Sequence, residues 1–74
     1  MSNFKYVVYN ENEYYVSQCL NIDISSFGKT IEEAVKNMVE AIELYYEDEM
    51  PTDYSLIQEI MVGEKNINVK TSVI

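Results

Sequence analysis

Two short runs of alternating apolar and polar residues open the chain and predict β-strands. The first covers Phe4–Tyr9 and the second Tyr14–Leu20, and both are rich in aromatic and β-branched residues. The polar residues 10–13 between them predict the turn of a β-hairpin, and a third, weaker strand is expected around Ile22–Phe27. Because neither face of the hairpin is purely polar, we expect one face to pack on a helix. The other is expected to be half covered by a partner or a second copy.

A change of period after residue 27 predicts an amphipathic helix from Thr30 to about Glu49. Thr30 is a good N-cap, and Glu33 is placed to complete a capping box with it. Gly28 is expected to supply a positive φ in the tight turn that leads from the third strand into the helix. The apolar positions recur at three- and four-residue steps and are Ile31, Ala34, Val35, Met38, Ala41, Ile42 and Tyr45.

The remainder of the chain predicts one further strand. Pro51 ends the helix, residues 56–62 form either an irregular crossover or a short strand, and alternation returns over Asn66–Ile74. The predicted order is therefore β-β-β-α-β: an antiparallel three-stranded sheet with one amphipathic helix packed on it and a final strand that joins the sheet. This is an α+β fold. Residues 1–74 are expected to form a single domain because no linker or repeat divides them.

The net charge of the chain limits the classes of partner that it is expected to bind. Its 74 residues include 13 acidic and 5 basic side chains and no histidine, which gives a formal net charge of −8. Binding to DNA or RNA depends on clustered basic residues, and the lysines of this chain are scattered. Direct nucleic-acid binding is therefore not expected. The acidity suits a basic protein partner, although a solubility role for surface charge is the commoner explanation.

Size and a lone cysteine set further expectations. A chain of this length is near the lower limit for folding on one core, which favours self-association or a partner. Cys19 has no second cysteine to pair with and is expected to be buried. The start of the chain lacks the features of a signal peptide, and no apolar stretch is long enough to cross a bilayer. The expectation is a cytoplasmic protein without a membrane span.

Four stretches of the sequence resemble the HicB family of antitoxin-like proteins. They are residues 6–8, 14–20, 27–34 and 37–44, and the most specific element is the Gly-Lys-Thr-Ile-Glu-Glu-Ala turn into the helix, residues 28–34. The resemblance implies the β-β-β-α-β layout of a truncated ribonuclease H fold. It also implies a binding function, because HicB-type proteins neutralise HicA-type toxins. Those toxins are small basic ribonucleases of double-stranded-RNA-binding fold that use a histidine.

The C-terminal part of the chain departs from the fuller members of that family. Many HicB antitoxins carry a helix-turn-helix or ribbon-helix-helix segment that represses their own operon, and residues 53–74 have neither paired amphipathic helices nor more than two lysines. DNA binding is therefore not expected. Two functions remain open. The first is an antitoxin that binds and occludes a HicA-like toxin. The second is an orphan family member that acts as a homo-oligomeric adaptor or small-ligand-binding module without a toxin.

The resemblance to ribonuclease H also raises the question of catalysis. Two-metal nucleases need several converging carboxylates, typically with one in the middle of the first strand, and Phe4–Tyr9 contains none. Cys19 has no histidine to activate it, so the composition excludes a Cys–His nucleophile. The chain is expected to be a binding protein with no catalytic residue, cofactor or metal site.

The predicted partner-binding surface lies at the C-terminal end of the helix. Acidic residues there face the negative end of the helix dipole, and a docking function would explain this small cost in stability. Such a run is more often simply a solvated helix end. Two tyrosines lie beside the acidic residues, and the full candidate set is Glu43, Tyr46, Glu47, Asp48, Glu49 and Tyr54. In the antitoxin hypothesis, this surface meets the basic RNA-binding surface of the toxin and blocks access of its substrate.

Overall fold

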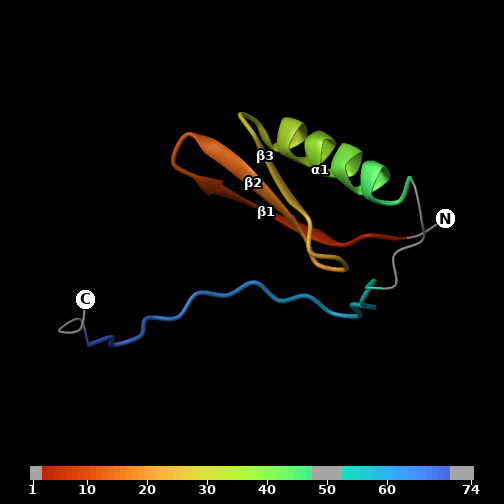
Figure 1. Cartoon of the computed structure of the whole chain (residues 1–74). Coiled ribbons are helices and arrows are strands. Elements are labelled where there is room, and N and C mark those ends of the chain that lie inside the picture. Colours follow the sequence, from red (N-terminus) through yellow and green to blue (C-terminus); the bar gives the residue numbers. More distant parts are fainter. Residues whose placement is uncertain (1–2, 48–52, 71–74) are drawn as a thin grey trace.

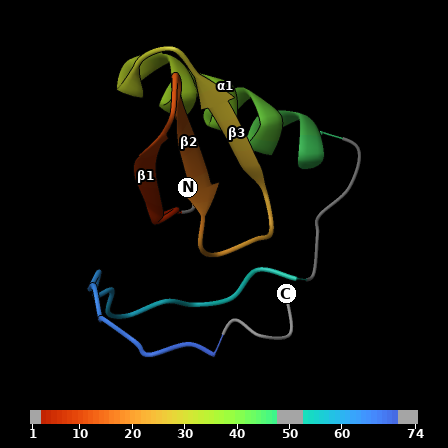
Figure 2. The same ribbon diagram turned by 90° about the vertical axis from the view of Figure 1, so that its left-hand side faces the viewer.

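The computed structural model describes residues 3–47 and 53–70, in which a three-stranded sheet is followed by one helix (Figure 1). The strands are β1 (Tyr6–Glu11), β2 (Tyr14–Cys19) and β3 (Ser25–Gly28), and the helix is α1 (Ile31–Tyr45). The strands pair antiparallel in the order β1-β2-β3, and α1 covers one face of the sheet (Figure 2). The predicted α+β fold, with one helix on an antiparallel three-stranded sheet, is confirmed.

The hairpin turn is shorter than the polar stretch predicted. Asn10 and Glu11 continue β1, so only Asn12 and Glu13 remain for the turn. Asn12 has a φ of 58°, in the left-handed region that asparagine enters more readily than most residues. Polar residues at the solvated end of a strand look like a turn in sequence, which explains the difference. The third strand also differs from its predicted range, because it begins at Ser25 after a bend over residues 20–23.

The strand register assigns the side chains to two faces of the sheet. On β2, Ser17 and Cys19 face α1 and are buried, whereas Tyr14 and Val16 project from the opposite side because side chains alternate along a strand. We call that opposite side the outer sheet face. Through the pairing of β2 with its two neighbours, its apolar residues are Val7, Tyr9, Tyr14, Val16 and Phe27.

The core lies between α1 and the inner face of the sheet. Its only buried hydroxyl among the described residues, that of Ser17, donates a hydrogen bond to the carbonyl oxygen of Ala34 at 2.7 Å. The Cys19 thiol is buried and free, as predicted. Ile31 and Tyr45 were placed in the apolar stripe of the helix, but they are 51% and 44% exposed, so the buried stripe is shorter than the pattern. The buried apolar residues are Cys19, Ile22, Ala34, Met38 and Ile42.

The turn from β3 into α1 confirms the predicted N-cap and corrects two details. The Thr30 hydroxyl accepts a hydrogen bond from the Glu33 amide at 3.0 Å, but the Glu33 carboxylate accepts from the amide of Lys29 rather than from that of Thr30. Gly28 does not have the expected positive φ. A Cβ atom there would lie 2.6 Å from the amide nitrogen of Ala34. Glycine is required because the helix start approaches the strand closely, not because of its backbone conformation.

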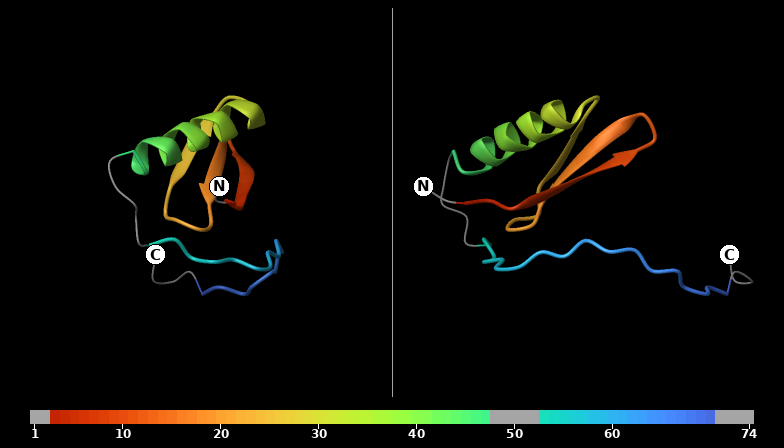
Figure 3. Two further views of the ribbon diagram at one scale, coloured as in Figure 1. Left: turned by 90° about the vertical axis from the view of Figure 1, so that its right-hand side faces the viewer. Right: turned by 180° about the vertical axis from the view of Figure 1, so that it is seen from behind.

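The chain leaves the helix earlier than predicted. α1 ends at Tyr45, and the amide of Tyr46 caps it by donating to the carbonyl oxygen of Ile42 at 3.1 Å. Residues 53–70 contain no helix or strand, and they run past the end of the sheet on the side away from α1 (Figures 1 and 3). The predicted final strand over residues 66–74 is thus not formed in its described part, residues 66–70, and the rest lies outside the described residues. We call residues 56–70 the arm.

Candidate functional site

Acidic side chains and one leucine form a continuous surface on the exposed side of α1. Glu40, Glu43 and Glu47 are spaced three and four residues apart, so they lie on one side of the helix and its C-terminal turn, and all are exposed. Leu44 lies between them and is 67% exposed. We call these four residues the acidic helix surface. The Nζ of Lys36 lies 4.0 Å from the Glu40 carboxylate, at its N-terminal edge.

The structure separates the predicted candidate residues into two groups. Glu43 and Glu47 are exposed on the acidic helix surface, and Asp48 and Glu49 lie outside the described residues. The two tyrosines lie elsewhere, and both pack on Phe4. The Tyr46 and Phe4 rings meet edge to face with centroids 5.8 Å apart, and the Tyr54 and Phe4 rings do so at 5.5 Å.

The aromatic packing gives Tyr46 a distinct environment. Partial burial raises the pKa of Tyr46 above its ordinary value, and the nearby Asp53 carboxylate raises this pKa further. The hydroxyl group therefore keeps its proton throughout the physiological range. The Tyr54 hydroxyl donates to the carbonyl oxygen of Asn3 at 2.5 Å. The two rings therefore hold Tyr46 and Tyr54 against the chain just before β1.

A buried asparagine completes this anchor, and sequence reasoning missed its function. Asn21 is 2% exposed, and its side-chain carbonyl accepts from the amide of Lys5 at 2.6 Å. Its side-chain amide donates to the carbonyl oxygen of Ser55 at 2.8 Å, and its backbone carbonyl accepts from the Ser55 amide at 2.7 Å. A polar residue between the apolar neighbours Leu20 and Ile22 was the available signal. Residues 53–55 are thus fixed to the body, and the arm starts from a defined point.

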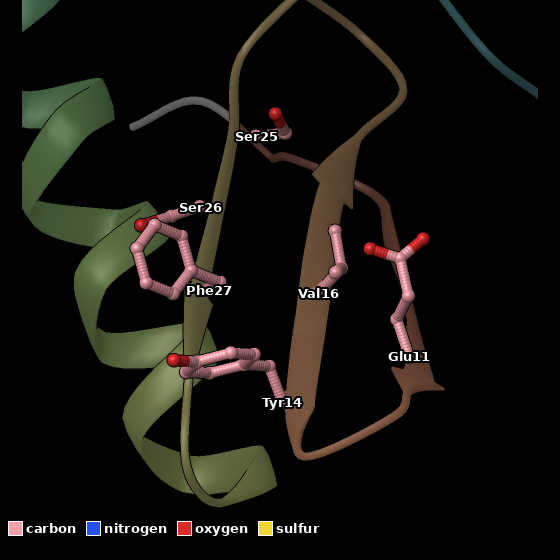
Figure 4. Close-up of a pocket in the computed structure, with 6 residues that line it drawn as sticks. All are labelled: Glu11, Tyr14, Val16, Ser25, Ser26 and Phe27. Carbon is pink, nitrogen blue, oxygen red and sulfur yellow. The ribbon is translucent and has the colours of Figure 1, made fainter.

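The outer sheet face carries the second candidate site. Tyr14 and Phe27 meet edge to face with ring centroids 5.6 Å apart, and Tyr14 is 48% exposed. Figure 4 shows a hollow beside these rings, with α1 behind the sheet. Its lining is mainly apolar with one carboxylate at the rim, and it consists of Glu11, Tyr14, Val16, Ser25, Ser26 and Phe27.

Within residues 3–47 and 53–70, no group of three or more histidine, cysteine, aspartate or glutamate side chains is placed to hold a metal ion. The one helix in these residues lacks the length and apolar character that a bilayer span requires. Comparison with protein-family models, with curated proteins and with solved structures gave no match.

Proposed function

We propose that this chain is a protein-binding module of antitoxin type that occludes a small, basic, HicA-like ribonuclease. The observation that carries the proposal is Leu44, an exposed apolar side chain surrounded by glutamates on the acidic helix surface. Protein interfaces combine a desolvated apolar anchor with a charged rim that selects the partner. A net charge of −8 and the helix-on-sheet fold expected of a HicB-like protein support the same function.

Occlusion follows from the complementarity of the two surfaces. The RNA-binding surface of a ribonuclease must be basic, since it competes for a polyanion. In the proposed complex, Glu43 and Glu47 pair with that surface while Leu44 packs at the centre, and Asp48 and Glu49 extend the acidic surface along the sequence. Tyr46 and Tyr54 contribute by holding the end of the helix and residue 53 onward in place. The action is binding, not catalysis, and its proposed location is the cytoplasm.

A pull-down from the native cells at moderate salt, with mass spectrometry of the bound proteins, is the first test. The expected result is a small basic protein that contains histidine and whose ribonuclease activity this chain inhibits. Charge reversal in Glu43→Lys/Glu47→Lys should then weaken binding at least about tenfold and reduce its salt dependence, because rim charges mainly steer association. Glu13→Lys/Asp23→Lys changes the net charge equally at exposed positions away from α1 and should retain binding.

The outer sheet face supports a second candidate function, an orphan module that self-associates as a homo-oligomeric adaptor or binds a small ligand. Tyr14 and Phe27 leave an apolar hollow uncovered on a face that has no helix. Recovery of the chain with no other protein bound would favour this function over the antitoxin function. Equal loss of toxin binding in the two charge-reversal variants would contradict docking at the acidic helix surface.

A further inference from the structure

The outer sheet face and the arm are two uncovered apolar surfaces of the same chain. On the sheet, Tyr9, Tyr14 and Phe27 are 49%, 48% and 61% exposed. On the arm, residues 66–70 alternate polar and apolar, the pattern of an extended segment with one face buried. The exposed apolar residues of the arm are Leu56, Ile60, Met61, Val62, Ile67 and Val69.

The amount of exposed surface is too large for a compact monomer. The chain exposes 6605 Å², whereas scaling with mass predicts about 4,700 Å² for a folded monomer of 8.6 kDa. Its radius of gyration is 15.3 Å, against about 11 Å expected for a compact chain of this length. Both excesses come with an extended arm in a molecule whose longest dimension is 48 Å (Figure 3), and every residue of the arm except Ile57 is exposed. Two copies together have an excess of about 3,800 Å², within the range that obligate dimers bury.

Charge favours a second copy of this chain as the occupant of the outer sheet face. The arm has two glutamates and two lysines and therefore no net charge, in a chain whose total is −8. A neutral, apolar segment can approach an acidic body without the repulsion that two acidic surfaces would meet. Glu11 at the rim of the hollow also offers a partner for a lysine of the arm, Lys65 or Lys70.

Two further features are consistent with two copies exchanging their arms: each copy has one arm and one outer sheet face, and the base of the arm is fixed to its own body. A dimer with two-fold symmetry covers both arms and both outer sheet faces, and no uncovered arm or face remains to add a third copy. The hydrogen bonds between Asn21 and Ser55 fix the base of the arm to its own body. Only the arm beyond this point then needs to order on the second copy, which limits the entropy lost on association.

We propose that two copies of this chain form a dimer by exchanging arms, with residues 56–70 of each copy covering the outer sheet face of the other. The inference goes beyond the proposed function and does not depend on a toxin. Ile67 and Val69 of the arm pack on Tyr14, Val16 and Phe27 of the second copy.

Sedimentation equilibrium on the full chain and three single variants tests the dimer. The wild type is expected to be a dimer, and Ile67→Glu in the arm and Phe27→Glu on the outer sheet face should each weaken dimerisation at least about tenfold. Val39→Glu is the matched control, because it adds the same charge to an exposed apolar position of α1, and it should leave the dimer intact. Circular dichroism confirms that each variant is folded, and Tyr14→Ser replaces Phe27→Glu if that variant unfolds.

Mixing the two variants tests the exchange itself. A heterodimer of Ile67→Glu with Phe27→Glu brings one intact arm onto one intact face, so the mixture should regain dimers that neither variant forms alone. A monomeric wild type, with the arm folded on its own sheet or free, would overturn the proposal. Dimers that survive both variants, or a mixture that stays monomeric, would overturn it as well. Failure of toxin binding in the charge-reversal variants would leave these results unchanged, so the two proposals fail separately.

Discussion

Asn21 and Ser55 are 34 positions apart and are joined in both directions. The Asn21 side-chain amide donates to the backbone carbonyl oxygen of Ser55 at 2.8 Å, and the Ser55 backbone amide donates to the backbone carbonyl oxygen of Asn21 at 2.7 Å. The bond from the Lys5 amide at 2.6 Å adds the start of β1. One buried side chain therefore connects the chain before β1, the bend after β2 and the base of the arm.

Replacing this asparagine should weaken the connection, because its side chain makes two of the three hydrogen bonds. Asn21→Ala removes two hydrogen bonds from a buried site and should lower the free energy of unfolding by about 1–3 kcal/mol. Urea denaturation measures this loss, and hydrogen exchange should show faster exchange of the Lys5 amide, which loses its acceptor. Asn66→Ala, at an exposed position of the arm, should change stability by less than about 0.5 kcal/mol. Unchanged exchange at Lys5 in Asn21→Ala would contradict the anchor.

The close approach at Gly28 predicts a second effect on stability. Gly28→Ala places a Cβ atom 2.6 Å from the Ala34 amide nitrogen and 2.8 Å from the Glu33 side chain, so the helix start must shift. Overpacking of this kind should cost about 1–3 kcal/mol, measured by thermal or urea unfolding. Gly63→Ala is the control, because its added Cβ would meet only the flexible side chain of Met61 at 3.2 Å. Similar stability of the two variants would contradict the steric explanation.

The Ser17 hydroxyl provides a test of the contact between helix and sheet. Ser17→Ala removes the hydrogen bond to the Ala34 carbonyl oxygen and should lower the free energy of unfolding by about 1 kcal/mol. The loss is modest because Ala is small enough to fit a site that is fully buried. Ser25→Ala, on the exposed side of the same sheet, should be nearly neutral. A neutral Ser17→Ala would show that the bond contributes nothing to stability.

The environment of Tyr46 predicts its behaviour at alkaline pH. Its pKa is raised in the folded chain, first by partial burial and then by Asp53, so folding favours the protonated hydroxyl. The corresponding stabilisation is complete below the ordinary tyrosine pKa of about 10 and is lost as pH rises through the higher folded-state value. Absorbance titration of the wild type minus that of Tyr46→Phe should give a midpoint above about 10. A midpoint at or below this value would contradict the environment described for Tyr46.

The alternation of apolar and polar residues and the helix N-cap could be read from the sequence, because each depends only on residues close together along the chain. The alternation around Val16 predicted the sheet, and Thr30 with Glu33 located the start of the helix. The end of the helix was placed too late, since acidic residues such as Glu47 have adequate helix propensity and only Pro51 offered a stop signal. Spacing alone places Tyr45 in the apolar stripe, but its side chain is 44% exposed and its hydroxyl donates to the Asp53 carboxylate at 2.8 Å.

The tertiary contacts of the candidate site were beyond the reach of local patterns. Tyr46 and Tyr54 were grouped with the acidic residues as neighbours in sequence, but their rings pack on Phe4 at the other end of the chain. Asn21 makes its bonds to residues 16 and 34 positions away, and no spacing rule connects such distant partners. The exposed apolar character of the arm was visible in the sequence. Its separation from the sheet was not, because alternation over Asn66–Ile74 is equally typical of a paired strand.

The reactivity of the buried Cys19 thiol can report how often this small fold opens. It is the only cysteine of the chain and is 2% exposed beneath α1, in contact with the cluster that contains Met38 and Ile42. Because the thiol is buried, a thiol reagent reacts with it in molecules that have opened locally around Cys19, so the labelling rate measures these openings without an engineered cysteine. Whatever tightens the molecule from outside, whether a second copy or a toxin, should slow that rate.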